Sequence, residues 1–307
     1  MNPLTAANLR GVWGTMLLPL GPDDEIDTGR LADQLDHLLG SGLDGVYAHG
    51  TAGEFHTLDE SEYDQVNELL ATRCEAAGVA YQIGACHPGP QATLRRVRRA
   101  RDLAPGALQV ILPDWLPLTD DEVGTYLTRV AEVADPVPLV LYNPPHAKTQ
   151  VTPGLLARLV ADVPALIGVK LAGGDDAWYE AIRDVDCAIF VPGHLLASGL
   201  ARGAHGSYSN VAALSPAGAA RWYASTLEDP DAGLDVERRI GEFFAGHVVP
   251  LQRRGLSNPA LDKFLAAVGG WAGAGTRIRW PMTSAPDTAV PAARATAQAL
   301  VPELFPA

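Results

Sequence analysis

The chain has 307 residues, a formal net charge of −13 and a hydrophobic content of 47%. Such a charge argues against a nucleic-acid or anionic-membrane partner, because both carry negative charge themselves. No apolar run approaches the roughly 20 residues that cross a bilayer, and no signal peptide is apparent. The cysteines, Cys74, Cys86 and Cys187, lack metal-ligand spacing and predict reduced thiols. We therefore expect a soluble, cytoplasmic protein.

Eight short apolar runs follow one another along the chain, each with a helix-like segment after it. Continuous apolar runs are typical of parallel strands that are buried on both faces. Between the first runs, residues 28–39 carry a stripe of leucines, and residues 59–73 begin with two acidic residues, as helices often do. The eight runs begin at Val12, Gly45, Ala80, Leu108, Pro138, Leu166, Ala188 and His205.

Eight strand–helix units within about 210 residues predict a closed (β/α)8 TIM barrel of the α/β class. An open doubly wound sheet is the alternative, but residues 14–19 after the first run lack its glycine-rich dinucleotide fingerprint. From residue 216 the alternation of strand-like and helix-like segments gives way to consecutive helical stretches rich in Leu, Ala and Arg. We therefore expect a barrel over residues 1–215 and a C-terminal helical region over 216–307 that packs on the barrel.

The one basic run of the chain covers residues 95–101, where arginines alternate with apolar residues. An anion-binding site is one interpretation of such a run. A short run of like charges within a helical pattern is more typical of a solvated surface. We therefore predict that these arginines form a solvated helix face.

Lys170 is one of only three lysines among 23 basic residues, and it ends the apolar run that begins at Leu166. An ε-amine beside apolar surface loses protonation, whereas a guanidinium stays charged. A neutral amine attacks a ketone to form a Schiff base. The alternative is a lysine that closes a strand and extends to solvent.

The side chains at the C-terminal ends of the strands meet at one end of such a barrel, where active sites lie. A tyrosine hydroxyl near the amine can carry the protons that Schiff-base chemistry requires. Several histidines also fall there, but the first strand lacks the His-x-His pair typical of metal-dependent barrels, so we expect no metal. The residues placed at this end include His49, Thr51, Ala52, Glu54, His87, Trp115, Tyr142, His146, Lys170, Gly193, His194 and Tyr208.

Four segments resemble, in order and spacing, the dihydrodipicolinate synthase / N-acetylneuraminate lyase family. They are GTAGE (50–54), YNPP (142–145), GVKLAGGD (168–175) and GAHGSYSN (203–210), and the resemblance covers nearly the whole chain. Members of that family are class I aldolases and related lyases with a TIM-barrel fold. They hold pyruvate, or the pyruvyl part of a larger 2-keto acid, as an imine on a lysine.

The resemblance implies a role for each matching residue. Lys170 would form the imine, Tyr142 would move protons, and Thr51 would hydrogen-bond that tyrosine. The backbone amides of Thr51 and Ala52 would hold the pyruvyl carboxylate, as turns of exposed N–H groups bind anions. No cofactor beyond the covalent imine is implied, and the expected assembly is a homo-oligomer, either a tetramer or a dimer.

Two further positions are implied to line the site, Gly193 through its carbonyl and Tyr208 beside the imine. We also expect His146 and His194 to contact polar groups of the substrate. Glu54 is expected to be a structural hydrogen-bond acceptor inside its loop rather than a catalytic base.

The chain departs from the synthase branch at four positions, one of them Leu171, where an acidic residue often follows the imine lysine. Ala52 replaces a hydroxyl-bearing residue, and Trp115 replaces a tyrosine that is donated across a subunit interface. In the synthase branch, an arginine shortly after the YNPP-like motif binds the carboxylate of the second substrate. This chain lacks that arginine, and His146 and Lys148 are the candidates to replace it.

We therefore expect a related aldolase or dehydratase acting on pyruvate or a pyruvate-derived 2-keto acid. The runner-up is the 4-hydroxy-tetrahydrodipicolinate synthase reaction, which condenses pyruvate with aspartate semialdehyde. Alternatives from other classes are a non-catalytic sensor that binds a 2-keto acid and a metal-dependent hydrolase.

Overall fold

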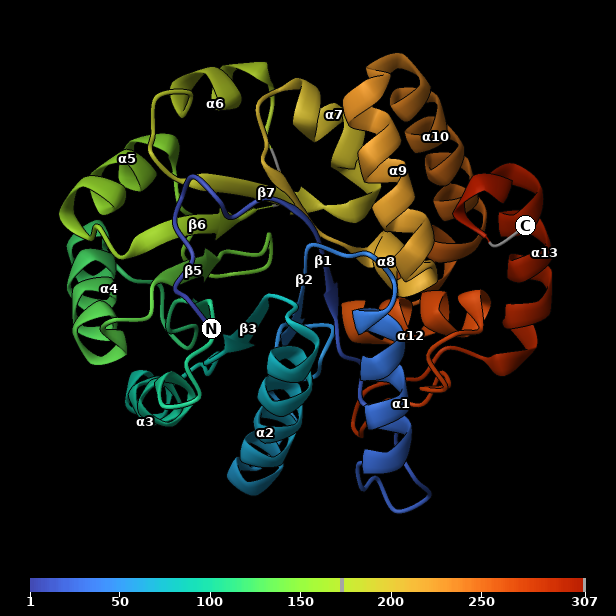
Figure 1. Ribbon diagram of the computed structural model, residues 1–307, viewed down its shortest axis with the longest axis horizontal. Coiled ribbons are helices and arrows are strands. Elements are labelled where there is room, and N and C mark those ends of the chain that lie inside the picture. Colours follow the sequence, from blue (N-terminus) through green and yellow to red (C-terminus); the bar gives the residue numbers. More distant parts are fainter. Residues whose placement is uncertain (172–173, 306–307) are drawn as a thin grey trace.

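The computed structural model describes residues 1–171 and 174–305, so Ala172 and Gly173 of the GVKLAGGD motif lie outside the described residues. Eight parallel strands form one closed barrel in sequence order (Figure 1). The predicted TIM barrel is confirmed. The strands are β1 Gly11–Thr15, β2 Gly45–Ala48, β3 Tyr81–Gly84, β4 Ala107–Val110, β5 Leu139–Tyr142, β6 Leu166–Lys170, β7 Ala188–Pro192 and β8 Gly206–Tyr208.

The barrel closes where β1 pairs with β8, with Gly11 opposite Gly206 and Trp13 opposite Tyr208. The two backbones approach closely here, since a Cβ on Gly206 would lie 2.0 Å from the Gly11 carbonyl oxygen. Almost every strand residue is buried, as the continuous apolar runs predict; the last residues of β6 and β7, Lys170 and Pro192, are half-buried.

Helices cover the outside of the barrel and begin with recognisable caps. The second helix starts with a capping box between Asp59 and Glu62 and ends at Gly78, whose φ of 68° is left-handed. The fourth has a second capping box, between Thr119 and Glu122. The helices are α1 Thr28–Leu39, α2 Glu60–Ala77, α3 Pro90–Arg101, α4 Asp120–Ala134, α5 Pro153–Asp162, α6 Asp176–Ala181 and α7 Leu196–Ala201.

The remaining helices gather on one side of the barrel, between α7 and α1 (Figure 1). The predicted boundary after residue 215 falls between α8 and α9. Helix α9 contacts β1, and α12 packs on α8, which directly follows β8. The C-terminal helices therefore reach the barrel end where the site is expected. They are α8 Asn210–Leu214, α9 Pro216–Glu228, α10 Pro230–Phe243, α11 Val249–Arg253, α12 Asn258–Gly269 and α13 Val290–Leu300.

Short helical turns connect several of these elements: η1 Gly193–Leu195, the π-helical turn η2 Phe244–Val248, η3 Asp287–Ala289 and η4 Pro302–Leu304. Among the described residues, no helix combines the length and apolar character that crossing a membrane requires.

Candidate active site

Lys170 and Tyr142 lie side by side because their strands are paired in register. Lys170 is the last residue of β6, and it is aligned with Tyr142, the last residue of β5. The Lys170 Nζ lies 4.3 Å from the centre of the Tyr142 ring. It is also 5.3 Å from the Tyr208 ring and 5.6 Å from the Tyr47 ring. Three tyrosine rings therefore surround the amine at this end of the barrel.

Thr51 reaches Tyr142 from the loop between β2 and α2. Its Oγ1 donates a hydrogen bond to the Tyr142 hydroxyl oxygen at 3.2 Å. The loop is tightened by the Glu54 N–H, which donates to the Thr51 carbonyl oxygen at 3.0 Å. In the described ranges, the backbone N–H groups of Thr51 and Ala52 donate to no other residue. They are thus available to an anion; their contact with a substrate carboxylate stays a prediction.

Burial changes the protonation of both groups. Desolvation lowers the pKa of Lys170 to about 8, against a smaller opposite effect of the Asp262 charge. It raises the pKa of Tyr142 to about 12, although the hydrogen bond from Thr51 acts the other way. A pKa near 8 leaves about a tenth of the amine neutral at pH 7, far more than for an ordinary lysine. The site therefore holds an amine with an appreciable neutral, nucleophilic fraction beside a protonated phenol.

Asp262 is an acidic residue whose charge acts on Lys170 and which the sequence analysis did not single out. It lies on α12, is half-buried, and is flanked by the fully buried Leu261 and Lys263. Burial raises the pKa of Asp262 to about 7, opposed by the charge of Lys170. The charges of Asp262 and Lys170 thus act on each other. Reasoning from strand ends could not find Asp262, because it comes from the C-terminal helical region.

A cavity of about 190 Å³ opens beside Thr51 and Tyr142. His146 belongs to its lining, and its contact with substrate stays a prediction. Trp115 does not belong to it: 82% of the residue is exposed. Lys148 is turned onto Trp115, with its Nζ 2.7 Å from the Trp115 carbonyl oxygen and 5.1 Å from the ring centre. Of the two candidates for the missing arginine, His146 faces the cavity and Lys148 does not.

His194 does not belong to the lining of this cavity. Its ring stacks on Phe244 at a centroid distance of 5.0 Å, and its Nδ1 lies 2.9 Å from the Asn210 Nδ2. The phenyl ring comes from the C-terminal helices, so the contact was not visible in the strand-end pattern. The expectation that His194 binds substrate is therefore not supported by its position.

Gly193 and Tyr208 occupy neighbouring strand ends. A Cβ on Gly193 would lie 2.3 Å from the Ser209 Oγ, so only glycine allows β7 to end this close to β8. The Tyr208 hydroxyl donates to the Gln82 Oε1 at 2.6 Å inside the barrel, which leaves the ring facing Lys170. Tyr208 thus lies where a residue beside an imine would be.

The other strand-end histidines are held by local contacts. The His49 ring is buried against Tyr63 at a centroid distance of 4.6 Å, and burial lowers the pKa of His49 to about 3. The His87 Nδ1 accepts a hydrogen bond from the Gly89 N–H at 2.9 Å. Within the described ranges, no three His, Cys, Asp or Glu side chains are grouped so that they could hold a metal ion.

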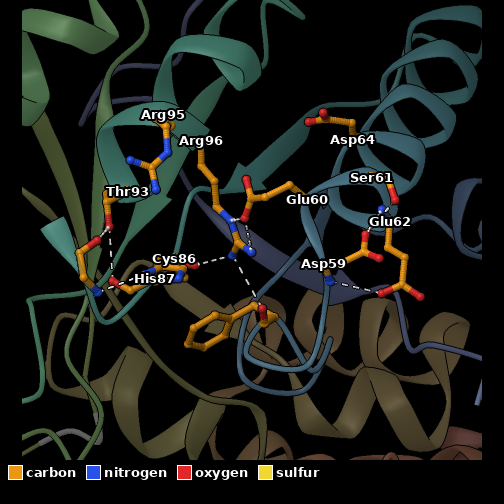
Figure 2. Close-up of polar contacts among 12 residues, drawn as sticks. Asp59, Glu60, Ser61, Glu62, Asp64, Cys86, His87, Thr93, Arg95 and Arg96 are labelled. Carbon is orange, nitrogen blue, oxygen red and sulfur yellow. Dashed lines mark hydrogen bonds and ion pairs between the residues drawn. The ribbon is translucent and has the colours of Figure 1, made fainter. Parts of the chain in front are cut away.

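The prediction that the arginines of α3 form a solvated helix face is only partly right. Arg95 and Arg98 are exposed, but Arg96 is fully buried, so the predicted solvated face is wrong for that residue. The Arg96 guanidinium lies 2.9 Å from the Glu60 Oε1 and donates to the Cys86 carbonyl oxygen at 2.7 Å (Figure 2). It thereby ties the end of β3 to the start of α2, next to the loop that carries Thr51.

A family model for the dihydrodipicolinate synthetase family matches residues 8–299. This chain belongs to that family. The predicted family is thus confirmed over nearly the whole length. Because the matched range includes α9 to α13, the C-terminal helices are part of the family architecture as well as the barrel.

Similar proteins of this family bear the names of synthases and lyases. A 4-hydroxy-tetrahydrodipicolinate synthase of Thermomicrobium roseum is 28% identical over 77% of this chain and 78% of its own length. An uncharacterized DapA-like lyase of Thermococcus kodakarensis is 27% identical, over 58% of this chain and 59% of the relative, so this alignment spans less than two thirds of the relative. These names agree with the predicted enzyme class, a lyase.

A solved structure shares the fold at low identity. It is a prophage protein of E. coli K12 from the dihydrodipicolinic acid synthase family, in complex with pyruvate. The TM-score is 0.82 at 18% identity, over 95% of this chain and 98% of the other. At this identity the likeness establishes the barrel with its helical extension.

Proposed function

We propose that this protein is a class I, Schiff-base-forming lyase, an aldolase or dehydratase, that acts on pyruvate or a pyruvate-derived 2-keto acid. The proposal rests on one observation: the Lys170 amine lies 4.3 Å from the ring of Tyr142, at a position where burial lowers the pKa of the amine to about 8. Family membership and the pyruvate complex of a structural neighbour support it.

The residues then perform the following steps. The Lys170 Nζ attacks the ketone carbon of the substrate, and loss of water gives an iminium ion. Tyr142, held by Thr51, carries the protons that the carbinolamine gains and loses. The iminium accepts the electrons of a neighbouring C–C or C–H bond and becomes a neutral enamine. Because the imine itself is the electron sink, this chemistry requires no metal or organic cofactor.

Chemical trapping tests the function directly. The protein is incubated with pyruvate and borohydride, digested and analysed by mass spectrometry. We expect a reduced pyruvyl adduct on the peptide that contains Lys170 and none without pyruvate. An unmodified Lys170 peptide across pyruvate and larger 2-keto acids would end the proposal. A non-catalytic sensor would bind these acids and be stabilised against heat without any product.

The pH dependence of trapping follows from the pKa of Lys170. The neutral amine attacks, so adduct formation with cyanoborohydride should rise about tenfold per pH unit and level off above about pH 8. The Asp262 charge raises the pKa of Lys170, so Asp262→Asn should move this midpoint to lower pH. Asp33→Asn, an exposed acid on α1, is the control and should not move it. A midpoint near pH 10.5 in the wild-type protein would contradict this prediction. So would equal midpoints in Asp262→Asn and Asp33→Asn.

The synthase reaction is the second candidate, because relatives such as the Thermomicrobium roseum protein bear that name. The placement of Lys148 argues against it. Its ammonium group is held by the Trp115 carbonyl oxygen instead of facing the cavity, where a second carboxylate would need a cation.

We also propose that the protein is a cytoplasmic homo-oligomer, a dimer or tetramer. Trp115 and Leu116 are 82% and 67% exposed, an unusual exposure for two adjacent large apolar residues beside a cavity. A second copy of the chain that covers them would complete the entrance to the site. The free, buried thiols of Cys74, Cys86 and Cys187 suit a reducing compartment.

A further inference from the structure

The cavity beside Tyr142 lies where the second substrate, the aldehyde that accepts the pyruvyl carbon, would bind. Thr51 and Tyr142 form one side of it, so a molecule in this cavity would lie next to a pyruvyl group held on Lys170. Its volume is about 190 Å³. An apolar cavity of about 150 Å³ in another protein accommodates benzene. The cavity therefore suits an aldehyde with a ring or a short chain of about six carbons.

The walls of this cavity are mostly apolar. In the described part of the chain, neither a lysine nor an arginine belongs to its lining. The apolar side chains come from the loops after β2, β3, β4 and β5 and are Phe55, Pro88, Ile111, Leu112, Pro144 and Ala147.

Thr51 and Tyr142 belong to the lining as well, but their polar groups are assigned to the pyruvyl half of the substrate. The other polar residues of the lining offer little to a second anion. Asp114 is itself acidic, and its Oδ1 accepts the Lys148 N–H at 2.9 Å. The His56 Nε2 lies 3.4 Å from the Met282 sulfur, and burial lowers the pKa of His56, which favours its neutral form. His146 is exposed at the rim, in contact with solvent. A carboxylate in this cavity would lose its water without gaining a buried cation.

We propose that the acceptor half of the substrate is an uncharged, mainly apolar aldehyde, and that the enzyme discriminates against aldehydes that carry a carboxylate. This inference rests on the proposed function. In the condensing direction, the enamine C3 attacks the aldehyde carbon and forms a C–C bond. The aldehyde oxygen takes up a proton, balancing the one that left C3, and water releases a 4-hydroxy-2-keto acid and the free Lys170 amine.

A panel of matched aldehydes tests this inference with the wild-type protein and pyruvate. Hexanal, benzaldehyde and methyl 4-oxobutanoate are the neutral members, and 4-oxobutanoate and aspartate semialdehyde carry the carboxylate. The readout is kcat/KM for the 4-hydroxy-2-keto acid. We expect the neutral ester to exceed 4-oxobutanoate by roughly 100-fold, because only the acid must bury an unpaired charge.

Equal or higher kcat/KM for the carboxylated aldehydes would overturn the inference. So would the absence of condensation with every neutral aldehyde while pyruvate still traps Lys170. Without a Lys170 adduct, the proposed function itself fails, so the two failures are distinguishable.

A charge-introducing variant provides a second measurement. Ile111 lines the cavity and is half-buried, so Ile111→Lys places a cation there without replacing a fully buried residue. We expect this variant to raise the preference for 4-oxobutanoate over its methyl ester by at least about tenfold, since the acid gains a partner. Leu227→Lys adds the same charge on the exposed surface of α9 and should leave the preference unchanged. An unchanged preference in Ile111→Lys would contradict the assignment of this cavity.

Discussion

Lys170→Arg is expected to abolish turnover of 2-keto acids, with a loss of at least about 10⁴-fold in kcat/KM. Arginine retains the positive charge between the tyrosine rings but is protonated at any working pH, so it cannot form an imine. The measurement is steady-state turnover together with pyruvate trapping. Both signals should disappear, while the circular dichroism spectrum stays that of the wild type.

Two comparisons isolate the amine as the cause. Lys148→Arg is the same substitution at a lysine whose Nζ is held by the Trp115 carbonyl oxygen, and it should leave turnover nearly unchanged. Tyr142→Phe keeps the amine and removes only the phenol. It should still form the trapped adduct, while kcat falls by about 10²- to 10⁴-fold because the proton carrier is gone. A Lys170→Arg protein that retains turnover would exclude the Schiff-base mechanism.

The sequence predicts the barrel well because each strand leaves a local signal. Strands such as β6 are buried on both faces, so their apolar runs mark them without reference to the rest of the chain. The same logic brings Lys170 and Tyr142 together, since the ends of adjacent parallel strands meet at one edge. The pairing of Thr51 with Tyr142 came only from the family resemblance, because a loop hydroxyl has no distinctive pattern.

Side-chain directions that depend on distant segments could not be predicted. His194 ends up against Phe244, and Lys148 against Trp115, because residues far along the chain provide those contacts. Arg96 looks like a surface residue within α3, yet its guanidinium is buried over the Tyr63 ring and donates to the Cys86 carbonyl oxygen. Asp262 lies on α12, whose position at the barrel end follows from packing on α8 and not from any pattern in its own sequence.

Glu54 and Lys263 form a buried ion pair that fixes the Thr51 loop to α12. The Glu54 Oε1 lies 2.5 Å from the Lys263 Nζ, and both side chains are 0% exposed. Two backbone contacts complete the arrangement: Lys263 donates to the Arg277 carbonyl oxygen at 2.6 Å, and Glu54 accepts from the Arg279 N–H at 3.2 Å. Glu54 thus acts as the structural acceptor expected from its loop position.

Lys263→Met should destabilise the protein by about 3–5 kcal/mol, because it leaves the Glu54 carboxylate buried without its partner. The free energy of unfolding in urea and the thermal midpoint measure this loss. Glu54→Gln/Lys263→Met removes both charges and should recover part of it, since an uncharged pair no longer requires buried compensation. Arg129→Met breaks an exposed ion pair with Glu132 and should have little effect.

If Lys263→Met is as mild as Arg129→Met, the buried pair does not hold the loop. If the double variant is less stable than the single one, the unpaired charge is not the cause of the loss. The loop also carries the hydroxyl that positions Tyr142, so turnover is a further readout. We expect kcat of Lys263→Met to fall at temperatures where the barrel remains folded, and the double variant to regain part of that activity along with its stability.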